Sequence, residues 1–570
     1  MSKIDPVLTE IIRNRLVAAT EEMAKTMIRT AFNPLLYEVQ DFSVTLMSAT
    51  GDMWAETAGV IVFSQGFPNA VRDGIRNWGG RIVEGDVLIV NDPFVTGTHI
   101  SDTNVYMPVF VGDRLVAFCG VAAHWADIGG KNPGGWCRDT TDMYQEGICF
   151  KHQKLIDAGV RNHALFDLIA ANVRVPVVVR GDLEAQIASC RQGARRVQEL
   201  CGKYGADTVE RSMAHVIEET DRSMRAMIAA LPDGSHEASI SLDSDGVSPE
   251  GPFRVNLTAT IAGDRMGFSL RGSSPTAAGP INLPAPSSKG ILASTMKGLL
   301  QPHDPCNAGH TRCIDFELPE DSLINPRYGA PTDSYGYLVV CLMELMFRCF
   351  ARVLPERCPA GGYQLAGAFL SRNASPGLEP FVMVDATHGG NGALRNADGV
   401  TNQLVGNGDL PNSPVEVTET RQPVRINFLR FAPEVAGAGT FRGGMGVAKE
   451  YELLEPGISA NFLIENTIDH TAIGFFGGEP GKTGHLRVIQ DGQASAPMRT
   501  ATGGIGPFPV GTRLQLTTSG GGGWGAPQSR DRTRVLEDVS NEFLTRDEAL
   551  TLYGVDVAAK NTCWTTGAPA

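Results

Sequence analysis

The sequence predicts an α+β protein of several subdomains, with mixed helices, largely antiparallel sheets and a Gly-rich, β-dominated second half. Three observations favour this class. Apolar residues recur at helical spacing near the N-terminus, and further helices are expected over 163–231. Short alternating runs joined by turns that contain Gly and Asp predict antiparallel hairpins. Glycine, with 65 of 570 residues, becomes dense after about residue 360.

Changes in sequence texture divide the chain into four parts. A length of 570 residues is long for one core, so two to four domains are expected. The expected parts are an N-terminal α+β domain with the candidate site (1–231), a central β-rich and helical domain (232–359), a Gly-rich β domain (360–530) and a peripheral tail (531–570).

The first domain begins with a predicted helix over 5–32, in which Asp5 is the N-cap residue and Pro6 the first helical residue. Residues 41–56 predict a hairpin that reverses near Thr50-Gly51-Asp52, and residues 67–79 a short helix. The elements expected next are strands over 85–90, 105–110 and 115–124, then helices over 163–173, 181–204 and 205–231.

After residue 232, alternating strands and turns replace the long helices. The stretch "FRVNLTATIAGDRMGFSLRG" predicts a second hairpin, and a helical run resumes around 333–353.

Composition excludes some classes of protein. A net charge of −14 argues against a nucleic-acid binder, which normally carries a basic face. No apolar run is long enough to span a membrane, and the start "MSKIDPVLTEIIRNR" lacks the apolar core of a signal peptide. We therefore expect a cytoplasmic protein without a nucleic-acid or membrane partner.

The eleven cysteines include no Cys-x-x-Cys pair, so we expect reduced thiols that lie mostly in the core. Cys137 and Cys149 lie near the candidate site described next, but nothing local predicts the lowered pKa of a catalytic thiol.

The stretch "NDPFVTGTHISDTNV", residues 91–105, places His99 and Asp102 in a loop between two predicted strands. A turn at Gly112-Asp113 would pair Val111 with Arg114. In that register Asp102 lies opposite Ala123, and Ser101 opposite His124, so two imidazoles and a carboxylate converge at one end of the hairpin.

Such a set can hold a metal ion with an open position, or can form a buried polar cluster without metal. Asp41, Asp127 and Glu146 could each complete the site, and spacing does not choose among them.

No nucleotide-binding motif is present. The chain has no G-x-x-x-x-G-K-[ST] phosphate loop and no G-x-S-x-G nucleophile elbow. The runs "SGGGGWG" and "GAGTFRGG" fit neither phosphate motif, and glycines of this kind allow tight turns or close backbone packing.

Together, several stretches in this order resemble the hydantoinase B/oxoprolinase family, the beta subunits of ATP-dependent hydantoinases, oxoprolinases and lactamases, with acetone-type carboxylase subunits as relatives. The resemblance covers about residues 5 to 527. The stretches include "NDPFVTGTHISDTNVYMPVF", "AAHWADIGG", "MYQEGI", "NAGHTRCIDFELPEDSLINP", "DATHGGNGA" and "SGGGGWGAP".

The resemblance implies one divalent metal ion, zinc, manganese or iron, on Asp41, His99, Asp102 and His124. It also implies a hydantoinase A-type alpha subunit that binds ATP, which we expect in an α2β2 hetero-oligomer. That partner would phosphorylate a small cyclic amide, a hydantoin, lactam or 5-oxoproline, and metal-activated water would open the ring here. Besides Asp102, we expect Asp127 or Glu146 to act in catalysis as general base, on proximity in sequence alone.

Two alternatives remain open: a subunit of an ATP-dependent acetone- or acetophenone-type carboxylase, and a non-catalytic scaffold for the ATP-binding subunit. For the substrate, an apolar pocket would suit a lactam, whereas neighbouring charges would suit 5-oxoproline or a hydantoin. The sequence slightly favours hydantoins or lactams.

Overall fold

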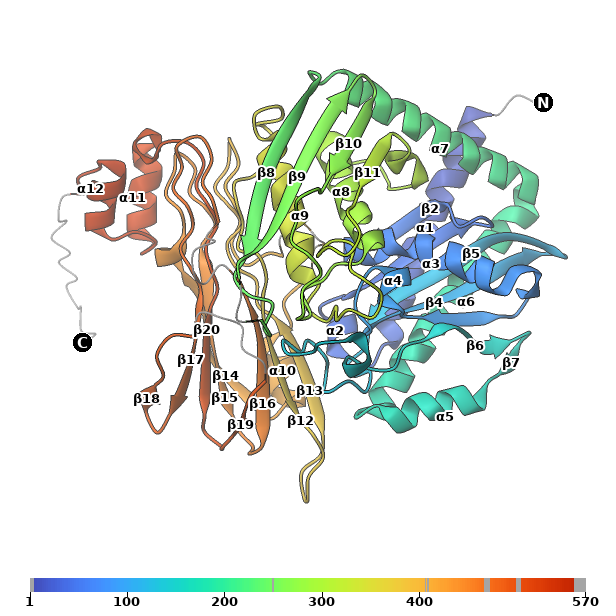
Figure 1. Cartoon of the computed structure of the whole chain (residues 1–570), viewed down its shortest axis with the longest axis horizontal. Coiled ribbons are helices and arrows are strands. Elements are labelled where there is room, and N and C mark those ends of the chain that lie inside the picture. Colours follow the sequence, from blue (N-terminus) through green and yellow to red (C-terminus); the bar gives the residue numbers. More distant parts are fainter. Residues whose placement is uncertain are drawn as a thin grey trace, which may run out of the picture.

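A computed structural model describes residues 5–248, 251–404, 406, 408, 410–465, 472–498 and 504–557. It confirms the α+β class, because helices pack on four separate sheets. All strand pairings within the described sheets are antiparallel except that of β10 (Arg265–Ser269) with β11 (Ile314–Glu317). Figure 1 shows the first half of the chain at the right of the molecule and the β-rich C-terminal half at the left.

A seven-stranded sheet of order β2-β1-β5-β4-β3-β6-β7 dominates the first half. Its strands are β1 (Phe42–Ser48), β2 (Met53–Ala58), β3 (Val87–Val90), β4 (Asp102–Val111), β5 (Arg114–His124), β6 (Lys151–Asp157) and β7 (Val160–Arg161). Side chains alternate between its two faces, as a strand requires. Along β5, Val121 belongs to the apolar cluster on one face and Ala122 to the cluster on the other.

Helices cover both faces of this sheet. The longest are α1 (Pro6–Thr30) and α6 (Pro176–Tyr204), which pack on each other and on one face, while α3 (Ile61–Trp78) packs on the other face. The shorter helices of this half are α2 (Pro34–Tyr37), α4 (Pro93–Thr96) and α5 (His163–Asn172). The N-cap prediction is confirmed, since the Asp5 carboxylate accepts hydrogen bonds from the Val7 and Leu8 amides.

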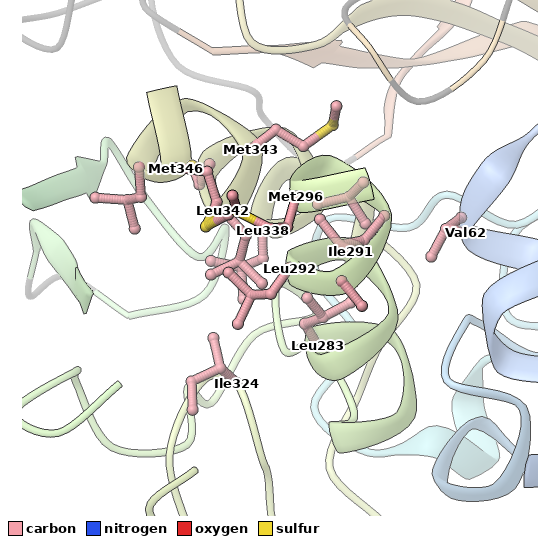
Figure 2. Packing of buried hydrophobic residues seen from close by; sticks show 14 of the residues in the cluster. Val62, Leu283, Ile291, Leu292, Met296, Ile324, Leu338, Leu342, Met343 and Met346 are labelled. Carbon is pink, nitrogen blue, oxygen red and sulfur yellow. The ribbon is translucent and has the colours of Figure 1, made fainter. Parts of the chain in front are cut away.

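The central part of the chain joins the same core. α7 (Ala206–Ala229) leads into a four-stranded sheet formed by β8 (Gly234–Leu242), β9 (Phe253–Ala262), β10 and β11. Two buried helices, α8 (Ala285–Leu300) and α9 (Gly336–Phe350), lie beneath it. Figure 2 shows apolar side chains of these two helices packed together, with Ile324 below them and Val62 of α3 nearby.

Two further sheets make up most of the C-terminal half, and an apolar cluster lies between them. One contains β12 (Ala366–Arg372), β13 (Phe381–Ala386), β16 (Ile458–Ile464) and β19 (Ile505–Phe508). The other contains β14 (Val424–Ala432), β15 (Gly446–Leu453), β17 (His485–Gln490), β18 (Gln493–Ala494) and β20 (Arg513–Thr517). A short helix, α10 (Val415–Arg421), precedes β14.

The run Gly520–Gly523 packs backbone against backbone rather than forming a turn. None of its four glycines has a positive φ. A Cβ atom on any of them would lie 2.0–2.1 Å from a carbonyl oxygen of another segment. The amide of Gly521 donates to the carbonyl of Gly444, and that of Gly522 to the carbonyl of Gly361. Only glycine allows such an approach, so these residues hold the Gly-rich segments together.

The tail begins with two helices, α11 (Arg532–Ser540) and α12 (Arg546–Tyr553), at the far left of Figure 1. Buried Arg530 ties them to the Gly-rich region. Its guanidinium lies 2.7 Å from Asp398 and 2.8 Å from Asp538.

Three sequence predictions need correction. The helix expected over 67–79 begins at Ile61, because Pro68 is tolerated within α3. The helix expected from 181 begins at Pro176, the first residue of α6. The hairpin register is also shifted by one residue, since a bulge between Val109 and Phe110 places Asp102 opposite His124 rather than Ala123.

Candidate metal centre

Three short pieces of chain bring the candidate ligands together. After α4, Gly97 adopts a left-handed conformation with φ +93°, and the chain turns so that His99 enters the core. Asp102 is the first residue of β4 and His124 the last of β5, and these two residues are paired in the ladder. The bulge in the hairpin therefore brings the two side chains closer than the predicted register did.

The three side chains form a tight triangle in the interior. Asp102 Oδ1 lies 2.9 Å from His99 Nε2 and 2.9 Å from His124 Nδ1, and the two nitrogens lie 3.0 Å apart. All three residues are buried. Among the described residues, they are the group of His, Cys, Asp and Glu side chains with the spacing of a metal site.

The tautomer of His99 is set by a residue far away in the sequence. His99 Nδ1 lies 3.0 Å from the Asp333 carbonyl oxygen and 3.1 Å from Asp333 Oδ1. Both are acceptors, so Nδ1 carries a proton and donates it, which leaves a lone pair on Nε2. That lone pair faces the Asp102 carboxylate, and two such acceptors require a proton or a cation between them. The donor set therefore fits a divalent ion.

Electrostatics support this arrangement. Burial alone would raise the pKa of Asp102, but the neighbouring His99 and His124 lower it well below the usual range. Burial would lower the pKa of His99, but the Asp102 and Asp333 carboxylates raise it well above its usual value. A metal ion would compete with the proton that these groups hold.

Tyr335 supports the remaining oxygen of the carboxylate. Its hydroxyl donates to Asp102 Oδ2 over 2.9 Å. Burial and the Asp102 charge raise the pKa of Tyr335, so it remains a donor at neutral pH.

Asp41 lies next to the three residues but is not part of their triangle. Its side chain borders the cavity next to the three residues, and its carbonyl oxygen accepts the amide of His124 over 3.2 Å. Burial raises the pKa of Asp41 to about 6.

The structure places Asp127 and Glu146 away from the cavity wall. Asp127 accepts from the guanidinium and the amide of Arg174 and from the amide of Gly134, over 2.7–3.0 Å. Glu146 accepts from the amides of Thr332 and Asp333 and from the Thr140 hydroxyl. Neither residue is among those that line the cavity. Glu146 instead holds the segment that carries Asp333.

The cavity has a volume of about 90 Å³. Its wall is formed mainly by aliphatic and aromatic side chains from α2, α3, α9, β12 and β13. The lining residues are Leu35, Val39, Asp41, Val60, Phe63, His99, Asp102, His124, Trp136, Tyr335, Gly336, Val340, Leu365, Ala366, Gly367, Phe369, Val384, Ala386, Leu404, Leu410 and Leu463. Residues from the first, central and C-terminal parts of the chain therefore complete one site.

Trp136 is the largest side chain on this wall. It has φ +53°, a conformation that a bulky residue rarely adopts, and it follows two glycines that also have positive φ. The indole lies edge to face with His99, with ring centres 4.9 Å apart, and stacks on Phe369 at 5.2 Å.

A larger cavity of about 460 Å³ lies between α3 and α8, but none of the three candidate ligands lines it. We assign the site to the smaller cavity because the convergent polar groups lie there.

Sequence reasoning missed Asp333, Tyr335 and Trp136. The signal for Trp136 was local, a bulky residue after two glycines in "NPGGWC". No local signal connects Asp333 or Tyr335 to a loop more than 200 residues earlier.

A cysteine nucleophile is disfavoured at this site. The ten cysteines of the described chain are free thiols, as expected. Burial raises the pKa of Cys137, and it raises that of Cys149 to about 12, so neither is a ready thiolate.

Within the described chain, no helix is both long and apolar enough to cross a membrane.

Comparison with known proteins agrees with the fold and shows the family. The sequence model of the hydantoinase B/oxoprolinase family matches residues 5–527, and the chain belongs to this family. It is 29% identical to a putative D-/L-hydantoinase subunit from Pseudomonas sp. (strain NS671), over 98% of this chain and 96% of that protein.

Two solved structures share the fold. The crystal structure of an ATP-dependent caprolactamase from Pseudomonas jessenii superposes with a TM-score of 0.89 and 26% identity, over 98% of this chain and 97% of that one. A nucleotide-free structure of acetone carboxylase gives a TM-score of 0.91 over 98% of this chain and 80% of that one. Its identity is 19%, so it shows the fold alone.

Proposed function

We propose that this chain is the hydrolytic, ring-opening subunit of an ATP-dependent cyclic amidase that acts on a hydantoin, a lactam or 5-oxoproline. The observation that carries the proposal is the buried triangle of His99, Asp102 and His124 on the wall of a small apolar cavity. Membership of the hydantoinase B/oxoprolinase family supports it.

His99, Asp102 and His124 would hold one divalent ion, zinc, manganese or iron, with Asp41 beside them. A divalent ion in such a site lowers the pKa of water and polarises a substrate oxygen.

The chain's own residues then have distinct roles. Asp333 holds the proton of His99 on Nδ1, and Tyr335 fixes the Asp102 carboxylate by a hydrogen bond. The apolar wall excludes bulk water, so these electrostatic interactions are stronger than they would be in solution. Asp41 borders the cavity beside the three ligands, where its carboxylate would accept a proton from attacking water. This role replaces the one expected for Asp127 or Glu146, whose oxygens bond to structural amides.

ATP would be bound by a partner, because the sequence contains no phosphate-binding loop of its own. We propose a hydantoinase A-type alpha subunit in an α2β2 assembly. That subunit would transfer the γ-phosphoryl group of ATP to the amide oxygen, which activates the carbonyl carbon. A first water then adds to this carbon, and the ring C–N bond breaks with its electron pair passing to nitrogen, which takes up a proton. The acyl phosphate that remains reacts with a second water to give the carboxylate and inorganic phosphate.

Metal analysis of the purified chain tests the site. We expect about one divalent ion per chain in the wild type and loss of the ion in His99→Ala and His124→Ala. His310→Ala removes another buried histidine, which caps the short helix Ala308–Thr311, and should keep the ion. Absence of metal from well-folded, metal-supplemented wild-type protein would overturn the proposed chemistry.

Activity of the complex with its partner tests the reaction. Phosphate release that matches ring opening, and that is lost in His99→Ala, supports the hydrolase. A requirement for bicarbonate would instead assign a carboxylase, and full activity of His99→Ala would leave only a scaffold role.

A further inference from the structure

We infer that the substrate of this site is a small cyclic amide whose ring carries no charged substituent, and that Trp136 and Phe369 form the wall that receives the ring. This inference rests on the proposed function, and it selects the simple lactams over 5-oxoproline and other carboxylate-bearing rings.

The charged residues on the cavity wall are the first support for a substrate without a charged substituent. No Lys or Arg is present among the described residues that line the cavity, whereas two carboxylates, Asp41 and Asp102, are. A divalent ion would pair with these two carboxylates and with the phosphoryl oxygens of the activated amide at the polar corner, and the apolar remainder of the wall offers no positive charge to a substituent of the ring. A substrate carboxylate would therefore be buried without a counterion, which is strongly unfavourable.

The apolar lining and the small volume of the cavity are the second support. Apart from the polar corner, the lining consists of aliphatic side chains such as Val340 and Leu365 and of the aromatic rings of Phe63, Phe369 and Trp136. These groups match the methylenes of a ring. The volume of about 90 Å³ is small beside the several hundred Å³ of an ordinary ligand pocket, so it favours a single ring.

Two buried ring nitrogens on the cavity wall have no hydrogen-bond partner among the described residues. They are Trp136 Nε1, which always carries a hydrogen, and His124 Nε2. Both residues line the cavity. A buried donor without an acceptor is costly, so an uncharged ligand that presents an amide oxygen would satisfy the indole N–H of Trp136.

The test compares three five-membered rings in the complex of this chain with its ATP-binding partner. 2-Pyrrolidone has no substituent, 5-oxoproline adds a carboxylate, and 5-oxoprolinamide adds a neutral group of similar size. We expect ATP-dependent ring opening of 2-pyrrolidone and 5-oxoprolinamide, with kcat/KM for 5-oxoproline at least about 100-fold lower than for its amide. An equal or higher kcat/KM for 5-oxoproline would overturn the inference and leave the proposed function intact. If none of these rings nor any larger lactam is opened, the proposed function fails instead.

A charge-gain variant tests the same point within the wall. Leu365 lies beside Gly336, which in turn contacts the Trp136 ring, so Leu365→Lys places an ammonium group near the indole. Leu365→Met is the matched control of similar length. We expect Leu365→Lys to raise the 5-oxoproline to 5-oxoprolinamide ratio of kcat/KM by about 10-fold and Leu365→Met to leave it unchanged. An unchanged ratio in a folded Leu365→Lys complex would count against the inference.

Binding of the ring to the metal-loaded chain can be measured without turnover. In the cobalt-loaded chain, 2-pyrrolidone should perturb the visible absorption spectrum at concentrations where 5-oxoproline does not. Trp136→Phe keeps a ring but removes the N–H donor, and it should weaken the 2-pyrrolidone response without loss of cobalt. If 5-oxoproline perturbs the spectrum at the lower concentration, the inference is wrong.

Discussion

Asp41 can act either as a metal ligand or as a proton acceptor, and a single substitution separates these two roles. It borders the cavity with His99, Asp102 and His124, yet its oxygens lie outside the closely spaced group that those three form. This position suits a metal ligand and suits a proton acceptor equally well.

Asp41→Asn distinguishes the two roles. If Asp41 accepts the proton, we expect the variant to keep its metal while ring opening falls by about 100- to 10,000-fold. This result is the expected one, because the other three side chains already have the spacing of a three-ligand site. Metal content and single-turnover rates measured on one preparation decide it. Loss of the ion would make Asp41 a fourth ligand.

Asp333 sets the protonation of His99, so its side chain should tune metal affinity. In Asp333→Ala, His99 Nδ1 keeps the carbonyl acceptor but loses the carboxylate. We expect metal affinity to fall by about 10- to 100-fold, as measured by competition with a chelator. Asp139→Ala removes a half-exposed carboxylate that pairs with Lys131 and should leave affinity unchanged. Equal affinities in the two variants would show that Asp333 does not act on the metal site.

At the scale of elements, the β4–β5 hairpin and the α6 helix position the site. The bulge in the hairpin pairs Asp102 with His124. Asp182 of α6 accepts hydrogen bonds from the amides of Phe32 and Asn33, over 2.8 and 3.1 Å, and so holds the link between α1 and α2. α2 contributes Leu35 to the cavity wall, so this contact connects α6 to the site.

Asp182 should make the stability of this link depend on pH. Burial raises its pKa from 3.8 to about 7. Below about pH 3.8 the carboxyl is protonated in both folded and unfolded chains. Between that pH and about 7 only the unfolded chain ionises, so the wild type loses stability as pH rises, and above 7 the loss is constant.

Asp182→Asn removes this titration. The variant should gain relative to the wild type between pH 4 and 7, by at most about 4 kcal/mol. Thermal unfolding midpoints at several pH values measure the gain. Glu199→Gln, at an exposed position of the same helix, controls for the loss of one charge. A difference between Asp182→Asn and wild type that does not vary with pH would refute the assignment.

At the scale of the whole molecule, the Gly-rich segments join the C-terminal half to the site. The segment that contains Gly521 packs against residues 391 and 444, and the adjoining sheet supplies Phe369 and Val384 to the cavity. Because the cavity is lined from three parts of the chain, none of those parts forms the site alone.

Gly521→Ala should therefore destabilise the C-terminal half. Its Cβ would lie 2.0 Å from the Asn391 carbonyl oxygen, and neither backbone can yield easily. We expect a loss of more than about 2 kcal/mol, seen as a lower unfolding midpoint. Gly202→Ala, in α6 with open space around its Cβ, should be neutral or stabilising by up to about 1 kcal/mol. Similar midpoints for the two variants would contradict the packing role of the glycine run.

The sequence determined what depends on neighbours along the chain. The spacing of apolar residues predicted α1, and the turn at Gly112-Asp113 predicted the hairpin that brings His99, Asp102 and His124 together. The ranges expected for α5 and α7 also agree with the structure to within two residues. These features could be predicted because a helical stripe, an N-cap or a two-residue turn is set by a few adjacent residues.

Only the tertiary structure decided the rest. The bulge that pairs Asp102 with His124 leaves no clear mark in the residue pattern, and a single extra residue changes every partner beyond it. Asp333, Tyr335 and Phe369 reach the site from positions more than 200 residues away. Their contacts depend on how separate sheets and helices pack, and local propensity does not encode the packing of distant surfaces.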